Sequence, residues 1–318
     1  MKLVPLLLLH LCGPVHADTP FPWSPVTINH KEYIPLTTIR QFYHFDQETI
    51  NGNRVQLQNR TATVDLTVGD QAARINGVRF FLSDPIKTRH QTPHLSKLDL
   101  TSLIDPVLRP HQIKQAPSFD TVVLDPGHGG SDQGSAGLEA KHTLAVALLI
   151  QEILGKKAYK VIMTRTGNER VPLPSRVGII NRQNNAIVIS LHFNSGRKEV
   201  SGFETYVVSA RQPHPAGQAS VALAAAVHTR SLMQLNHARS GHHFRTLDRG
   251  IRHARFRLLK DSKHPIILIE AGFLTHKKEA SLITTKAYQQ TLADAIAQGI
   301  ADYRISISKK ERQDRVSP

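Results

Sequence analysis

Three apolar stretches of the sequence lead directly into polar residues suited to metal or acid–base chemistry. These junctions run from Leu124 to His128, from Leu191 to His192 and from Ile269 to Glu270. Parallel strands of an open sheet present their carboxyl ends at one edge, where ligands gather. His128, His192 and Glu270 are therefore candidate site residues. Because the chain has 18 histidines, it is their joint placement that carries the argument.

A fourth polar residue extends this set toward a metal site. Glu139 begins a predicted helix beyond the first junction, so its carboxylate could face the same crevice. The glycines beside His128 permit a tight turn that aims the imidazole across the sheet edge. Two imidazoles and one carboxylate that leave a fourth position open form the ligand set of a catalytic zinc ion. Glu270 would then be free to act on water.

The elements that must position these residues alternate between strand and helix. The expected elements are the strand Thr121–Leu124, helix Glu139–Leu154, strand Lys160–Thr164, helix Pro174–Asn181, strands Ala186–Leu191 and Phe203–Val208, helix Gln218–Leu235, strand Ile266–Ile269 and helix Tyr288–Tyr303. This alternation predicts an α/β fold with a mainly parallel sheet flanked by helices. We expect the domain to span residues 119–305, followed by a disordered basic tail at 306–318.

Residues 18–110 show a different pattern, in which short alternating segments are separated by turn signals. Expected strands are Lys31–Leu36, Arg54–Leu57, Ala62–Leu66, Gln71–Ile75 and Val78–Leu82, and expected helices are Thr37–Phe42 and Leu98–Ile104. Asn51-Gly52 and Asn76-Gly77 are typical of hairpin turns. The pattern predicts a small β-rich domain without a cluster suited to chemistry, joined by a proline-bounded linker at 111–118.

Residues 1–17 have the features of a secretory signal peptide, namely one lysine, an apolar core and a small-residue ending at Ala17. The apolar core is shorter than the roughly 20 residues that a spanning helix needs. No later stretch is apolar enough either, so we expect no integral membrane segment. The single cysteine, Cys12, lies in this leader, so the mature chain would have neither disulfides nor a cysteine nucleophile.

The formal net charge of +15 would suggest nucleic acid as the partner of a cytosolic protein. Export changes this interpretation, because the anions outside the membrane are envelope polymers and lipid head groups. We therefore expect an envelope partner and no nucleic acid, with a purely solubilising role for the charge as the alternative.

The junction residues also carry a resemblance to a known family. The matching phrases are Leu124 to Gly130, Glu139 with Leu144-Ala145, Val161 to Arg165, Ser190 to Asn194, Gly202 to Tyr206 and Ile269 to Leu274. Together they resemble the zinc-dependent N-acetylmuramoyl-L-alanine amidases of the Amidase_3 family. The resemblance implies a zinc amidase/exopeptidase-like fold and hydrolysis of peptidoglycan between N-acetylmuramic acid and L-alanine. It further implies that His128, Glu139 and His192 bind zinc and that Glu270 is catalytic.

Two departures from the family pattern concern Glu139. The stretch between His128 and Glu139 is shorter than is usual, and Ala140 stands where a lysine commonly follows the glutamate. Asp132 is therefore an alternative ligand. His142, one helical turn beyond Glu139, could also approach the site, although a solvated helix position fits it better.

Further polar residues lie near the same phrases. Asn194 either binds substrate or caps the turn after its strand. We expect Glu204 to have a structural or substrate-contact role. Arg165 and Arg176 could contact a peptide carboxylate, and the sequence assigns them no role.

A looser resemblance concerns the small domain. Lys31 to Leu36, Ile75 to Val78 and Leu82 to Pro85 are similar to phrases of the N-terminal domain of copper amine oxidases. The resemblance implies wall targeting or spacing, with a plain structural role as the alternative.

Two other functions stay open. One is a zinc peptidase of the same fold acting on another amide, and the other is a catalytically silent wall-binding protein. The complete set of four candidate residues argues against the silent protein. The segment Ser209–Arg249 has room for one helix and a His/Arg-rich loop, without an acidic helix that would plug a zinc site. We therefore expect an enzyme whose site is not blocked by a helix of its own chain, and any activator protein is unknown.

Overall fold

The computed structural model describes residues 23–114, 116, 118–237 and 244–308. The expected signal peptide lies outside these residues, as does the tail from 309 onward. Among the described helices, none combines the length and the apolar character that crossing a membrane requires.

The N-terminal part is rich in short antiparallel strands. Its elements are β1 Val26–Ile28, β2 Lys31–Pro35, α1 Leu36–Phe42, β3 Gln47–Asn51, β4 Arg54–Gln58, β5 Thr63–Thr67, β6 Ala72–Ile75, β7 Val78–Phe81, β8 Lys87–Arg89, β9 Thr92–Ser96, α2 Lys97–Asp99, a π-helical turn Leu100–Ile104, α3 Asp105–Leu108 and a 3-10 turn Pro110–Gln112. Both expected hairpins form, since Asn51 pairs with Arg54 and Ile75 with Val78. At the second turn Asn76 and Gly77 both have positive φ, as a type I′ turn requires.

The C-terminal part alternates strands with helices. Its elements are β10 Thr121–Pro126, a 3-10 turn Ser135–Gly137, α4 Glu139–Gly155, β11 Lys160–Met163, α5 Leu173–Asn181, β12 Ala186–Asn194, β13 Phe203–Val208, α6 Gly217–Leu235, β14 Asp248–Ala254, α7 Arg257–Asp261, β15 Ile266–Phe273, α8 Lys277–Ile283 and α9 Lys286–Ser308. The expected helices are all present, and α9 extends the last of them beyond Tyr303.

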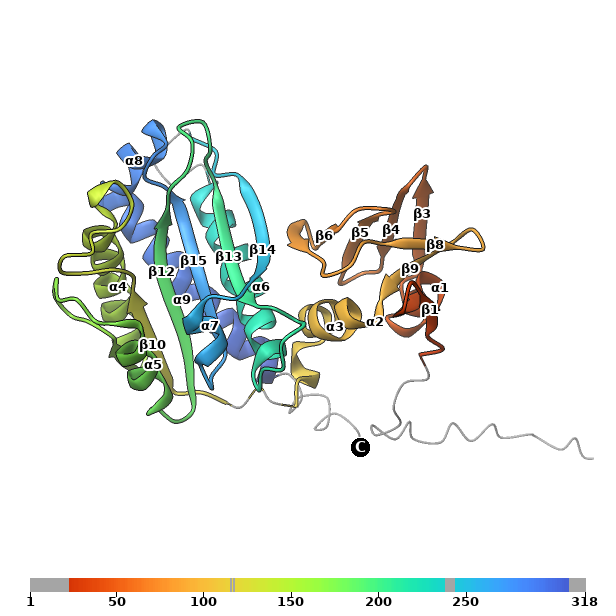
Figure 1. The fold of residues 1–318 in the computed structure, drawn as a ribbon, viewed down its shortest axis with the longest axis horizontal. Coiled ribbons are helices and arrows are strands. Elements are labelled where there is room, and N and C mark those ends of the chain that lie inside the picture. The colour runs from red at the N-terminus through yellow and green to blue at the C-terminus, as the bar shows by residue number, and fades with distance from the viewer. Residues whose placement is uncertain (1–22, 115, 117, 238–243, 309–318) are drawn as a thin grey trace, which may run out of the picture.

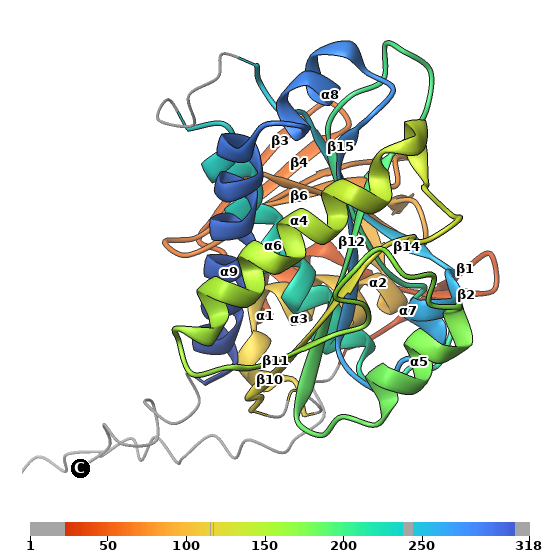
Figure 2. The ribbon, with the colours of Figure 1, turned by 90° about the vertical axis from the view of Figure 1, so that its left-hand side faces the viewer.

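The strands of this part form one twisted layer between two groups of helices (Figure 1). Their order is β11-β10-β12-β15-β13-β14, and every neighbouring pair is parallel except β13 with β15. Figure 2 shows α4, α6 and α9 on one side of the sheet and α5 and α7 on the other. Side chains of β15 alternate accordingly, with Ile267 in the larger core and Leu268 in the smaller one. The predicted α/β class is confirmed, and the sheet is mixed.

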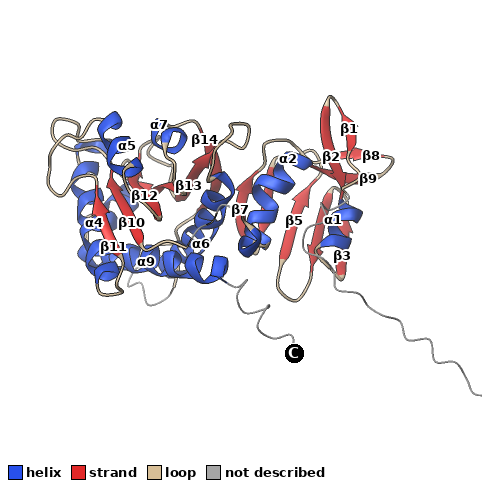
Figure 3. Ribbon diagram, turned by 90° about the horizontal axis from the view of Figure 1, so that it is seen from below, coloured by secondary structure: helices blue, strands red, loops and turns tan. Residues whose placement is uncertain are grey.

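The two parts share a sheet edge. Ile251 of β14 pairs in parallel with Phe80 of β7, so the strands form one continuous sheet that runs on through β6, β5 and β4 to β3. In Figure 3 the strands of both parts follow one another along the long axis of the molecule. Asp248 fastens this edge, since it accepts from the backbone N–H of Arg79 at 2.8 Å and lies 3.1 Å from Nε2 of the buried His228.

Three features differ from the sequence-based expectation. Strand β14 was not expected, because only Gly250 and Ile251 are buried in its polar sequence. Strands β12 and β15 continue past their apolar stretches, so His192 and Glu270 lie within strands and not after them. These strands extend because their pairing extends, with His192 directly opposite Glu270.

Candidate metal centre and active site

The candidate ligands come from three neighbouring elements at one edge of the sheet. His128 follows β10 and has φ 61°, and the glycines at 129 and 130 also have positive φ, so the chain turns sharply there. Glu139 is the first residue of α4. His192 stands on β12 just before a register shift that separates it from Asn194. Such irregularities redirect side chains beside functional sites.

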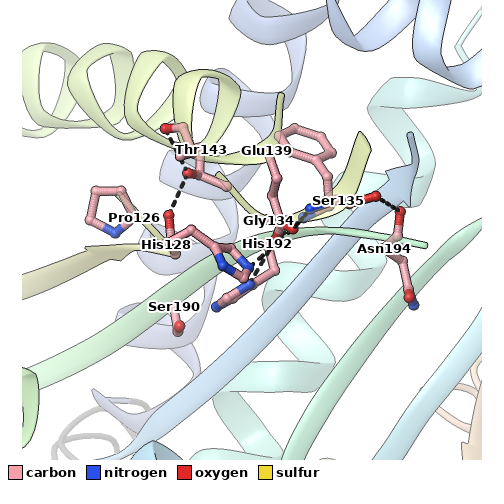
Figure 4. A network of polar contacts seen from close by, with 12 residues as sticks. Pro126, His128, Gly134, Ser135, Glu139, Thr143, Ser190, His192 and Asn194 are labelled. Atoms are coloured by element: carbon pink, nitrogen blue, oxygen red, sulfur yellow. Dashed lines mark hydrogen bonds and ion pairs between the residues drawn. The ribbon is translucent and has the colours of Figure 1, made fainter. Parts of the chain in front are cut away.

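Glu139 lies between the two imidazoles (Figure 4). Its Oε2 is 3.1 Å from Nε2 of His128, and its Oε1 is 2.8 Å from Nδ1 of His192. One ligand atom from each of the three residues can be chosen so that all lie within 4.8 Å of one another. This distance lets one ion contact all three, so the structure brings together the three residues expected to bind a metal.

Backbone donors hold the Glu139 carboxylate in place. The N–H groups of Ser135 and Phe193 donate to it at 2.7 and 3.1 Å. Burial disfavours its charge, but the hydrogen bonds from His128 and His192 outweigh burial and hold its pKa below the ordinary value. In return, the hydrogen bond with Glu139 raises the pKa of His128 to about 9. The site therefore carries a fixed negative charge between two rings that are a quarter exposed or less.

Asp132 occupies the outer side of His128. Its Oδ1 is 2.9 Å from Nδ1 of His128, and its side chain is 55% exposed. A carboxylate on the second ring nitrogen fixes the orientation of a metal-binding histidine. The contacts thus favour Glu139 as the carboxylate ligand and Asp132 as the residue that orients His128.

Glu270 is a half-buried carboxylate on β15. Its Oε2 has no hydrogen-bond partner among the described residues, and it stands opposite His192 on the neighbouring strand. Burial raises the pKa of Glu270 to about 7, although the nearby His192 opposes this shift. A carboxylate with such a pKa can both accept and return a proton near neutral pH.

Glu204 lies on the other side of Glu270, directly opposite it across β13 and β15. Its carboxylate accepts from Nδ2 of Asn194 at 2.6 Å, from the Tyr206 hydroxyl at 2.9 Å and from Nε of Arg249 at 2.9 Å. Oδ1 of Asn194 in turn accepts from the N–H of Ser195 at 2.8 Å. Both polar groups of the Asn194 side chain are thus used within the protein, as a capping role requires.

Sequence reasoning named Arg165 and Arg176 but did not identify their role, which is to support the His128 turn. Arg165 is buried and donates to the carbonyl oxygens of Gly127 and Ala140 at 2.8 and 2.7 Å. Arg176 is buried too and donates to Oδ1 of Asp125 at 2.7 Å. Contact with a substrate carboxylate does not fit this burial. The available signal was the position of Arg165, which follows strand β11 at the same sheet edge.

His142 also differs from its expected position. It is buried and its Nδ1 lies 3.0 Å from Nε2 of Gln289 on α9, so it packs between helices and is not solvated. His142 lies one turn of α4 beyond Glu139, where the helix packs against α9. This packing explains why the side chain is buried and not solvated.

The site opens into a cavity of about 640 Å³. His128, His192 and Glu270 line it together with the apolar residues Leu173 and Phe256. Two further guanidinium groups, those of Arg170 and Arg257, also line it. A cavity of this size, lined by both apolar and ionisable side chains, is typical of a site for a substrate with mixed character.

Comparison with known proteins identifies the family of the chain. A family model described as Amidase_3, N-acetylmuramoyl-L-alanine amidase, matches residues 122–302. The match covers more than half of the chain, so the chain belongs to the Amidase_3 family of N-acetylmuramoyl-L-alanine amidases. The family expected from the sequence phrases is confirmed.

Individual relatives align with a similar share of the chain, a little more than half. It is 31% identical over 186 residues to the uncharacterized protein YqiI of Bacillus subtilis, covering 58% of this chain and 84% of that one. It is 29% identical over 184 residues to a sporulation-specific N-acetylmuramoyl-L-alanine amidase of Bacillus subtilis, covering 56% and 66% respectively. The solved N-acetylmuramoyl-L-alanine amidase AmiC2 of Nostoc punctiforme is 32% identical, with a TM-score of 0.51, covering 59% of this chain and 98% of that one.

Proposed function

We propose that this protein is a zinc-dependent N-acetylmuramoyl-L-alanine amidase that hydrolyses peptidoglycan at the bond between N-acetylmuramic acid and L-alanine. The observation that carries the proposal is the cluster of His128, Glu139 and His192 beside the unpartnered carboxylate of Glu270. Membership of the Amidase_3 family supports the choice of substrate.

The residues present fit a zinc ion. Two imidazoles and one carboxylate, with room for a further ligand, are the donor set of catalytic zinc sites. His128 would bind through Nε2, because its Nδ1 is engaged by Asp132. Zinc bound there would lower the pKa of a water molecule to about 7 and polarise the substrate carbonyl.

Glu270 performs the proton transfers. It accepts a proton from the water that attacks the lactyl carbonyl, and it returns that proton to the leaving L-alanine nitrogen as the amide bond breaks. The products are a lactyl carboxyl group and a free L-alanine amino terminus. The raised pKa of Glu270 suits both steps, since the group can be charged before the attack and protonated after it.

The remaining residues position this machinery. Arg165 donates to the carbonyl oxygen of Gly127 and Arg176 to that of His128, so both hold the backbone of the His128 turn. Glu204 holds Asn194 at the end of β12. We propose that the protein acts after export, at the cell wall, with residues 18–110 as a wall-directed domain and 119–305 as the catalytic domain. The net positive charge supports an anionic envelope partner.

Digestion of purified sacculi tests this proposal. The mature protein should bind about one zinc per chain and release peptides with a free L-alanine amino terminus while the glycan stays intact. A chelator should abolish the release and added zinc should restore it. Cleavage at another amide would indicate a peptidase of the same fold, and full activity of metal-free protein would refute the zinc mechanism.

A further inference from the structure

A cross-strand row of residues connects Glu270 with the N-terminal part of the sheet. Successive neighbours in this row are Glu270, Glu204, Gly250, Arg79, Arg74 and Asp65. The residues that alternate with them, such as Phe80 and Ile251, face the larger core on the opposite side. The side of the sheet that holds Glu270 therefore continues onto β7, β6 and β5 as one surface.

The junction between the two parts keeps this surface continuous. Gly250 has no side chain, and a Cβ there would lie 3.0 Å from both the Arg79 carbonyl oxygen and the Phe81 ring. The guanidinium of Arg252, from β14, lies 4.0 Å from the centre of the Phe81 ring on β7. This cation–π contact connects β14 with β7 on the same side of the sheet as Glu270.

Beyond the joint this surface carries both arginines and aspartates. Arg54, Arg74 and Arg79 border a hollow of about 650 Å³ over β4 to β7. Two aspartates also border it, and their only hydrogen-bond donors are neutral, since Asp65 accepts from Gln56 at 2.6 Å and Asp70 from the backbone N–H of residue 71 at 2.7 Å. Arg74 pairs with Asp248 at 3.4 Å, whereas Arg54 and Arg79 have no acidic partner among the described residues. Guanidinium groups pair well with carboxylates, so the hollow suits an acidic ligand.

The spacing of the strands indicates how long such a ligand must be. Strand β6 lies four strands from β15, which at about 4.8 Å per strand is about 20 Å along the sheet. An extended peptide covers this distance with about six residues. A molecule that occupies both ends at once is therefore a polymer and not a single small substrate.

Arg252 likewise pairs with Glu204 at 3.7 Å. We propose that Arg54 and Arg79, here called the arginine face, bind carboxylates of neighbouring stem peptides on the glycan strand whose amide is cleaved beside Glu270. The inference rests on the proposed function and adds to it a second contact region for polymeric substrate. The N-terminal strands then act as part of the substrate-binding surface.

The test compares polymeric and single-unit substrates. Arg54→Gln and Arg79→Gln are combined, because both side chains border the hollow, whereas Arg74 is also held by the Gly77 carbonyl at 2.8 Å. The KM for soluble glycan chains should rise about tenfold or more, the value of one charge-assisted hydrogen bond. The KM for a single disaccharide-peptide should not change. Lysine at both positions should restore most of the affinity for the chains.

Arg89→Gln is the matched control. Arg89 is exposed on β8 in the separate four-stranded sheet, so its loss removes charge without touching the arginine face. Its KM for both substrates should match the unaltered protein. Equal thermal stability of all variants shows that they are folded.

Co-sedimentation with peptidoglycan stripped of phosphate polymers gives a readout independent of turnover. The double glutamine variant should bind such peptidoglycan less tightly than the Arg89→Gln control. Unchanged binding, or binding only to preparations that keep phosphate polymers, would overturn the inference. If the unaltered protein binds through these arginines but cleaves neither substrate, the proposed function fails, and only the contact between the arginine face and stem-peptide carboxylates remains.

Discussion

Glu270 on β15 and Glu279 on α8 lie in adjacent regions of the molecule, and burial raises the pKa of each to about 7. Their surroundings differ. Glu279 accepts hydrogen bonds from the backbone N–H groups of Gly202 and Phe273 at 2.9 and 2.7 Å. Glu270 has one oxygen without any hydrogen-bond partner among the described residues, and it faces the His128–His192 cluster.

This comparison shows that a raised pKa alone does not identify a catalytic acid or base. Glu279 ties the loop before β13 to the end of β15, which is a structural task. A third carboxylate, Asp125, is buried, but the adjacent Arg176 and the hydroxyls of Thr164 and Ser190 hold its pKa below the ordinary value. Only the carboxylate with a free oxygen is available to exchange a proton with substrate.

The largest effect should come from removing a metal ligand. His128→Ala or His192→Ala each takes one imidazole from the cluster, so zinc content should fall and activity should fall to background. Metal analysis of purified protein measures this directly. His142→Ala is the control, because His142 contacts Gln289 and not the cluster. Retention of stoichiometric zinc by both cluster variants would remove these histidines from the ligand set.

Breaking the ion pair between Asp125 and Arg176 should lower the free energy of unfolding. Arg176→Met leaves the Asp125 carboxylate buried without its cation, and such changes destabilise proteins by about 3–5 kcal/mol. Denaturant unfolding at neutral pH measures the loss. The double variant Asp125→Asn with Arg176→Met should regain part of it, since no buried charge is then left unpaired. Equal stability of the single variant and the unaltered chain would contradict the proposed support of the His128 turn.

Glu279→Gln should change how stability depends on pH. The folded pKa of Glu279 is raised, so the folded state binds its proton more tightly than the unfolded state does. The stabilisation that protonated Glu279 gives the folded state is therefore fully present below the unfolded pKa of about 4.3. It is lost as pH rises through about 7. The loss is on the order of 3 kcal/mol. Melting temperatures between these pH values should vary less in Glu279→Gln, while zinc binding and turnover stay close to normal. A pH profile that the substitution leaves unaltered would refute this.

The sequence predicts the site residues at the edge of the sheet better than the residues that hold them in place. His128, His192 and Glu270 follow recognisable apolar stretches, and parallel strands bring such positions together whatever the details of packing. The roles of Arg165 and Arg176 could not be predicted in this way. Both lie in a polar segment, and their burial depends on how α5 and β11 pack beside β10.

The junction of the two parts is a second feature that sequence patterns miss. Strand β14 has one buried large apolar residue, Ile251, so its alternation is weak. Its partner β7 lies far away in the chain, and the pairing depends on long-range contacts such as that between Asp248 and Arg79. The separate patterns of the two parts therefore predicted their classes but not the shared edge.

The central claim is that Glu139 holds the metal while Glu270 moves protons, and substituting each by glutamine tests it directly. Glu270→Gln should keep its zinc, while turnover falls by at least the roughly 10²–10⁴-fold assigned to general acid–base catalysis. Glu139→Gln should bind zinc less tightly than the unaltered protein. If Glu270→Gln loses zinc while Glu139→Gln keeps it and stays active, the two roles are wrongly assigned, and Asp132 becomes the next ligand to test.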